Sequence, residues 1–126
     1  PTQPWTVYPE ILSASDASLI NLCPELRTPV VPSKLLSIMA AGRPVIASLP
    51  QESDARLMIA DGGCGLTVDA GDEKALAAAI GTLAADRALG REMGRRGRAY
   101  AEKNLSRDHC TGQMESVMMK AIGVKE

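Results

Sequence analysis

Aromatic side chains are scarce in this chain of 126 residues. Trp5, Tyr8 and Tyr100 are the only ones, and phenylalanine is absent. Domains that bind single-stranded nucleic acid stack bases on several aromatic rings and hold the phosphates with an excess of basic side chains. The formal net charge of -1 provides no such excess. We therefore expect no nucleic-acid partner.

Histidine and cysteine are equally sparse. His109 is the only histidine, and the three cysteines show no Cys-x-x-Cys spacing. A zinc site lacks ligands, and catalysis by a Ser-His-Asp or Cys-His group would have to use His109. The odd number of cysteines favours small buried thiols in a reduced, cytoplasmic protein over disulfides.

Long apolar runs and phosphate-binding loops are missing too. No stretch approaches the roughly 18 to 20 apolar residues that span a bilayer, and no signal peptide opens the chain. Neither a GxxxxGK[ST] loop nor a GxGxxG loop is present, so a nucleoside triphosphatase or a dinucleotide enzyme has no support. The arginine-rich segment at 91–98 could meet phosphate groups, but such a charge-rich run is more typical of a solvated helix face.

Strand-like and helix-like segments alternate along the chain. The patterns predict strands at residues 17–22, 44–48 and 65–69, and helices at 9–15, 33–41, 52–60, 73–85, 88–103 and 106–122. This alternation predicts the α/β class, a Rossmann-like doubly wound parallel sheet. Three strands are few, and the chain opens without Met. We therefore expect one partial domain over 1–126, truncated on its N-terminal side, with C-terminal helices at about 87–123.

Side-chain patterns also predict caps and buried faces. Asp72 and Ser106 are expected to cap the helices that follow them. The helix at 52–60 is expected to bury Leu57, Met58 and Ala60, and the helix at 73–85 to bury its apolar positions, Ile80 included. In the last helix the apolar side consists of Met114, Val117, Met118 and Ala121.

The segment Pro32–Ser48 is the most informative part of the chain. Ser33 can cap the helix that starts here and Lys34 adds a positive charge, so the helix start suits a phosphate or pyrophosphate. Gly42 can end the helix in the left-handed conformation, and Pro44 prevents its resumption. The run Val45-Ile46-Ala47 then predicts a strand buried on both faces.

Four motifs carry a resemblance to a known family: Pro9–Ile20, Val31–Ser48, Gly63–Val68 and Met93–Tyr100. In this order the chain resembles the C-terminal, donor-binding domain of group 1 (family 4) retaining glycosyltransferases. It is most similar to the bacterial branch that builds capsule, exopolysaccharide or O-antigen. The resemblance implies half of a GT-B fold, in which two Rossmann-like domains face a cleft and the C-terminal one holds a nucleotide-sugar donor.

The resemblance also implies site residues. The family's donor helix corresponds to residues 33–41, which places Ser33 and Lys34 at the donor diphosphate. Two glutamates of the family correspond to Pro29 and Ser37. Pro29 supplies no carboxylate, and Ser37 can make one hydrogen bond to a ribose or sugar hydroxyl. Glu52 is the nearest acid that could take such a contact.

The reaction implied is transfer of a sugar with retention, without a metal ion or other cofactor, and no Asp-x-Asp motif is present. Its catalytic residues are unknown from this segment, which is expected to be inactive alone. The implied partners are the nucleotide-sugar donor, an N-terminal acceptor domain of the same parent chain and a lipid-linked acceptor at the inner membrane face. A degenerate nucleotide-sugar-binding or scaffold domain, and a GT-B-fold nucleotide-sugar epimerase, stay open as alternatives.

Overall fold

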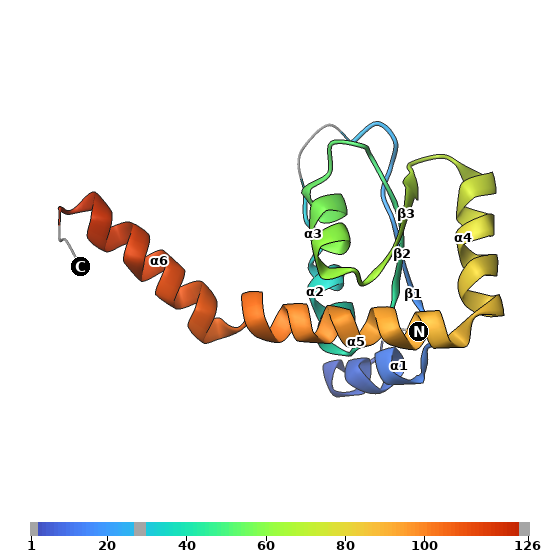
Figure 1. The fold of residues 1–126 in the computed structure, drawn as a ribbon, viewed down its shortest axis with the longest axis horizontal. Helices are drawn as coiled ribbons and strands as arrows, with labels where there is room; N and C mark the ends of the chain where they lie inside the picture. The colour runs from blue at the N-terminus through green and yellow to red at the C-terminus, as the bar shows by residue number, and fades with distance from the viewer. Residues whose placement is uncertain (1–2, 27–29, 124–126) are drawn as a thin grey trace.

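The computed structural model describes residues 3–26 and 30–123 as three strands with helices before, between and after them (Figure 1). In chain order the elements are η1 (Trp5–Val7), α1 (Tyr8–Ala14), β1 (Ser18–Asn21), α2 (Ser33–Ala40), β2 (Val45–Leu49), α3 (Asp54–Gly62), β3 (Gly65–Asp69), α4 (Glu73–Ala85), α5 (Arg87–Asn104) and α6 (Arg107–Ala121). Each predicted element is present, and every predicted boundary lies within two residues of the observed one.

The strands form one parallel sheet in the order β1-β2-β3, with Val45 opposite both Ser18 and Gly65. All five residues of β2 are buried, because the strand is central and helices cover both of its faces. Gly42 ends the preceding turn with a φ of 66°, as predicted. The doubly wound α/β class is therefore confirmed.

The two faces of the sheet build two cores. Leu35 and Met39 of α2 and Ile59 of α3 pack on one face, whereas Ala79 and Leu83 of α4 pack against Ile46 on the other. Successive side chains of a strand point to opposite faces of the sheet. Val45 and Ala47 therefore face α2 and α3, whereas Ile46, between them, faces α4.

Some predicted core positions are wrong. Leu57 and Ala60 are exposed, and α3 instead buries Ala55 and Ile59 against the sheet. Apolar residues surround this short helix, so its sequence does not define a single buried face. Ile80 is 46% exposed, because α4 meets the sheet through Ala79 and Leu83.

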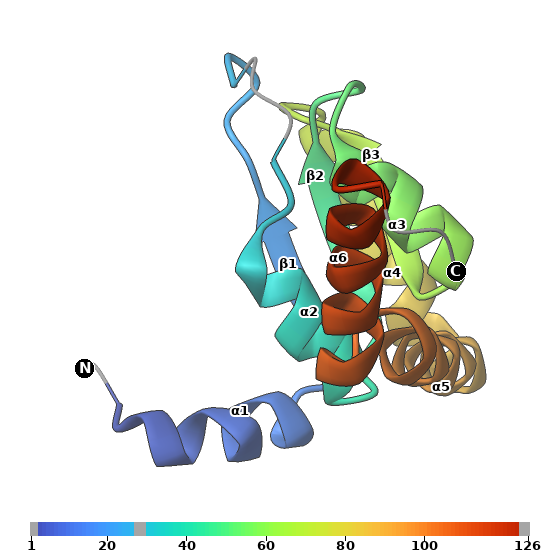
Figure 2. The same ribbon diagram turned by 90° about the vertical axis from the view of Figure 1, so that its left-hand side faces the viewer.

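Helix α5 crosses the amino ends of the strands and packs against α2 (Figure 1), while Figure 2 shows α1 on the opposite side of this end of the molecule. Its buried residues are Gly90, Gly94, Gly97 and Ala101, which recur at helical spacing. A Cβ at Gly94 would lie 2.1 Å from the Gly42 carbonyl oxygen, and one at Gly97 would lie 2.8 Å from Cys64 Cβ. Gly94 therefore lets the helix backbone touch the turn before β2, and Gly97 lets it approach Cys64 just before β3.

Helix α6 extends beyond the end of α5, away from the sheet (Figure 1). Ser106 caps its start as predicted, accepting a hydrogen bond from the His109 N–H at 3.3 Å. None of its residues is buried, and Met114, Val117 and Met118 are 59–68% exposed. The predicted apolar side exists, but none of the residues in 3–26 or 30–123 covers it.

Candidate functional site

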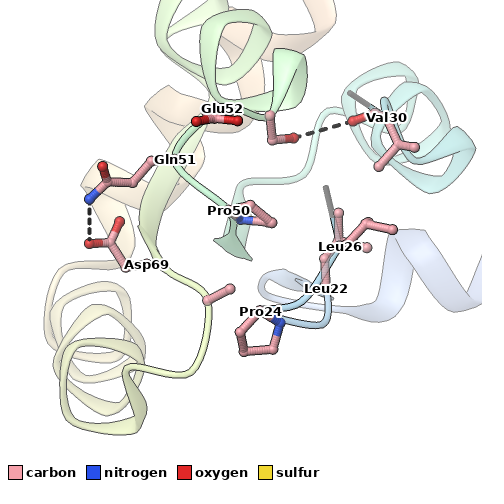
Figure 3. A pocket seen from close by; sticks show the side chains of 10 residues that line it. Leu22, Pro24, Leu26, Val30, Pro50, Gln51, Glu52 and Asp69 are labelled. Atoms are coloured by element: carbon pink, nitrogen blue, oxygen red, sulfur yellow. Dashed lines mark hydrogen bonds between the residues drawn. The ribbon is translucent and has the colours of Figure 1, made fainter. Parts of the chain in front are cut away.

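In an open parallel sheet the loops at the carboxyl ends of the strands form the natural ligand site. A cavity of about 470 Å³ lies there, between the segments that follow β1, β2 and β3. Figure 3 shows this carboxyl-end pocket, with Gln51 and Asp69 on one side and Leu22, Leu26 and Val30 on the other. Its volume lies within the range of small-molecule sites.

Carboxylate and amide groups make up the polar wall of the pocket. Gln51 Nε2 donates a hydrogen bond to Asp69 Oδ2 at 3.2 Å. The Glu52 carboxylate is exposed and pairs with no side chain in the described part of the chain. It is therefore free to accept hydrogen bonds from a ligand. Ser53 is buried, and its hydroxyl donates to the Val30 carbonyl at 3.2 Å, which ties two walls together.

Arg56 supports this wall from behind. Its Nη2 lies 2.9 Å from the Leu49 carbonyl oxygen and 2.7 Å from that of Val68, and Nε donates to the Pro50 carbonyl at 3.1 Å. The same Nη2 lies 2.5 Å from Asp69 Oδ1. One side chain, 22% exposed, thus joins the ends of β2 and β3 to α3.

Sequence reasoning missed Arg56. A signal was present, because arginine in the first turn of a helix opposes the helix dipole and needs another partner. That partner is formed by the carbonyl groups of two strand ends, which only the folded sheet brings together.

The charge of the pocket limits what it can bind. Glu52 and Asp69 line it, and none of its described lining residues is basic. Carboxylates accept hydrogen bonds from hydroxyl groups and can hold two of them at once. The pocket therefore suits a ligand rich in hydroxyls, while a phosphate needs cations or backbone N–H groups from elsewhere.

Ser33 and Lys34 lie at the start of α2 and are exposed. The predicted Ser33 cap is wrong: the helix starts at Ser33 itself, Pro32 holds the capping position, and no side chain accepts a hydrogen bond there. Because Ser33 already has helical backbone angles, its hydroxyl is not placed as a cap residue's would be. The first N–H groups of α2 lack intrahelical partners, as at any helix start. Neither residue lines the carboxyl-end pocket.

Ser37 lies one turn further along α2, half-buried in a different hollow beside Arg98 and Leu105. Glu52 is in the carboxyl-end pocket, so the structure does not bring these two predicted contacts into one cavity. Pro29 lies outside the described residues. The roles assigned to Ser33, Lys34, Ser37 and Glu52 stay predictions.

No helix within 3–26 or 30–123 is long and apolar enough to cross a bilayer. Over the same ranges, no three side chains of His, Cys, Asp or Glu are grouped so that they could hold a metal ion.

Helices on both faces of a parallel sheet, with a cavity at its carboxyl ends, define a Rossmann-like α/β unit. The family model for glycosyl transferases group 1 matches residues 5–86, more than half of the sequence. The chain therefore belongs to the glycosyl transferases group 1 family, and the resemblance read from its motifs is confirmed at that level.

A solved structure agrees with this assignment. Sucrose-phosphate synthase from Thermosynechococcus elongatus matches with a TM-score of 0.75 and 26% sequence identity. The alignment covers 91% of this chain but 27% of the synthase chain, so the fold corresponds to part of a GT-B glycosyltransferase. A search of curated proteins finds no match.

Proposed function

We propose that this chain is the donor-binding part of a retaining glycosyltransferase that moves a sugar from a nucleotide-sugar to an acceptor in capsule, exopolysaccharide or O-antigen synthesis. Family membership and the likeness to a sucrose-phosphate synthase support glycosyl transfer. The observation that carries the proposal is the carboxyl-end pocket, where a free carboxylate, Glu52, faces a cavity of about 470 Å³.

In the proposed site, two groups of residues bind different parts of the donor. Glu52 accepts hydrogen bonds from hydroxyls of the ribose or the sugar, and Ser37 contributes at most one such bond. The N–H groups at the start of α2, near Ser33, and the ammonium of Lys34 bind the diphosphate.

In the proposed reaction the bond between the anomeric carbon and the diphosphate oxygen breaks, and positive groups stabilise the negative charge that develops on the leaving diphosphate. Lys34 supplies one such charge. The remaining catalytic groups belong to other parts of the parent protein, so the chain alone is expected to be inactive. The proposed transfer needs no metal ion or other cofactor.

The exposed apolar side of α6 is evidence for a further domain as a binding partner. Its apolar side is uncovered by the described residues, and the chain spans 27% of the synthase that it matches. We place an N-terminal acceptor domain of the same parent chain against this side. A lipid-linked acceptor at the cytoplasmic face of the inner membrane completes the proposed reaction.

A second candidate is a degenerate nucleotide-sugar-binding or scaffold domain. Pro29 and Ser37 favour it, because they stand where the family carries glutamates, and so does the lack of a basic side chain among the described residues of the pocket wall. The chain would then retain donor binding in a parent protein that performs no transfer.

Calorimetric titration with UDP, GDP and ADP, and with the corresponding nucleosides, tests the donor site. We expect Lys34→Gln to weaken binding of the preferred diphosphate about tenfold and to leave its nucleoside unaffected, because one charge-assisted contact to phosphate is lost. Glu52→Gln is expected to weaken both ligands by a similar factor.

Lys120→Gln and Glu115→Gln on α6 are matched controls, because they make the same changes far from the site. Binding that is absent at millimolar concentration for all three diphosphates would refute the proposal. So would losses equal to those of the controls.

A further inference from the structure

A second cavity lies at the opposite end of the sheet from the carboxyl-end pocket. Its volume is about 420 Å³, and it opens between the start of β2, the end of α4 and the start of α5. We call it the amino-end cavity. Pro44, Ile46 and Leu83 form a buried apolar floor, and Ile80 extends the apolar wall. This floor suits the body of an apolar ligand.

Three arginines surround the apolar floor: Arg43, Arg87 and Arg91. Asp16 is the one acidic residue among the described residues of the wall. A wall with three guanidinium groups and one carboxylate is positive, so it favours a ligand that carries negative charge.

The partners of these arginines differ from those of their neighbours on α5. Arg95 and Arg96 both bond Glu92, and Arg98 bonds Glu102. By contrast, Arg87 and Arg91 form no ion pair within the described ranges. The arginines of α5 that lie away from the cavity are therefore paired with glutamates, whereas the two beside the cavity are unpaired within the described ranges.

Arg43 is held in place at the cavity wall. Its Nη2 donates a hydrogen bond to the Ser13 carbonyl. Its Nε is buried, so a ligand in the cavity would meet the positive charge of Arg43 and not this N–H.

The shape and lining narrow the ligand class. The apolar floor suits a hydrophobic body, and the guanidinium groups beside it suit a phosphate or carboxylate. We propose that the amino-end cavity binds an anionic amphiphile, a small molecule with one phosphate or carboxylate group and an apolar body. This site is separate from the donor site, because the two cavities lie beyond opposite ends of β2.

Decyl phosphate, below the concentration at which it forms micelles, is the probe. Decanoate is its carboxylate counterpart and decanol its neutral counterpart. We expect decyl phosphate or decanoate to shift the amide resonances of Gly42, Ala84 and Gly90, and to bind at least about tenfold more tightly than decanol. The tighter of the two anions identifies the head group.

Variants test the arginines directly. The double variant Arg87→Gln with Arg91→Gln is expected to lower affinity for the anion at least about tenfold, because two charged contacts are lost. Both residues are exposed, so we expect the double variant to keep the fold. Arg95→Gln with Arg96→Gln makes the same change on the same helix and is expected to leave affinity unchanged.

Equal affinity for decanol and the anions would overturn the proposal, because the cavity would then be only an apolar hollow. The same conclusion follows if the two double variants behave alike, or if shifts occur only along α6. Titration of the Arg87 and Arg91 double variant with UDP separates this proposal from the donor site, since UDP binding is expected to persist there.

Discussion

The contact between α5 and the turn before β2 gives the sharpest test of the packing. Gly94 lies where the two backbones meet, and a Cβ added there would be 2.1 Å from the Gly42 carbonyl oxygen and 3.3 Å from Arg43 Cα. Both atoms belong to the backbone, so no side chain can rotate out of the way. Gly94→Ala therefore forces the helix and the turn apart.

The size of the effect follows from this geometry. Ordinary contact begins at about 3.4 Å, so relief of the 2.1 Å contact needs a displacement of roughly 1.3 Å. Overpacking in a well-packed interior costs about 1–3 kcal/mol, and an unyielding backbone places this case at the upper end. The higher helix propensity of alanine offsets about 0.5–1 kcal/mol of this cost, because glycine is the poorer helix former. We expect Gly94→Ala to lower the free energy of unfolding by about 2 kcal/mol.

Urea unfolding followed by far-ultraviolet circular dichroism measures this change. Gly81→Ala in α4 has no atom within 4 Å of the new Cβ, and at Gly90 the nearest atom is Pro44 Cγ at 3.7 Å. Both control variants are expected to match or exceed the stability of the original chain. A Gly94→Ala variant as stable as these controls would refute the close approach of α5.

Three other predictions concern single polar side chains. Arg56→Met is expected to lower the free energy of unfolding by about 2–3 kcal/mol, because it leaves strand-end carbonyls without their charged donor, and Arg56→Lys less; urea unfolding measures both. Hydrogen bonds from Arg95 and Arg96 lower the pKa of Glu92 to about 2 from its ordinary 4.5. The stabilisation by Glu92 is therefore full above pH 4.5 and is lost as the pH falls toward 2. The difference in unfolding midpoint between the original chain and Glu92→Gln is expected to shrink over that interval, and a constant difference would contradict the coupling. Asp86 accepts a bond from the Leu89 N–H at 2.8 Å, so Asp86→Ala is expected to cost about 1 kcal/mol in urea unfolding and Asp86→Asn much less.

Features set by neighbouring residues were predictable from the sequence. The run Val45–Leu49 is a central strand, and Asp72 caps α4 by accepting a bond from the Ala75 N–H at 2.8 Å. Both depend on residues close together in the chain. The position of Glu52 in the carboxyl-end pocket also agrees with the sequence, since Glu52 lies in the loop after the strand predicted at 44–48 and the loops at the carboxyl ends of parallel strands meet at one edge of the sheet.

Features set by distant residues were not predictable. The buried face of α5 consists largely of glycine, which a search for apolar side chains does not detect. Ser37 and Glu52 fall in different cavities, because α2 carries Ser37 toward α5 while the loop after β2 carries Glu52 to the carboxyl ends of the strands. The Arg56 contacts require two strand ends to meet, which no local pattern contains.

We propose that the carboxyl-end pocket and the start of α2 together bind a nucleotide-sugar donor. The most direct measurement is a map of amide resonance shifts during titration of the labelled chain with the preferred nucleoside diphosphate. We predict the largest shifts at Ser33 and Lys34 and at residues 51–53 and 69–70. The absence of shifts at millimolar ligand, or shifts confined to the amino-end cavity at Arg87 and Arg91, would contradict the claim.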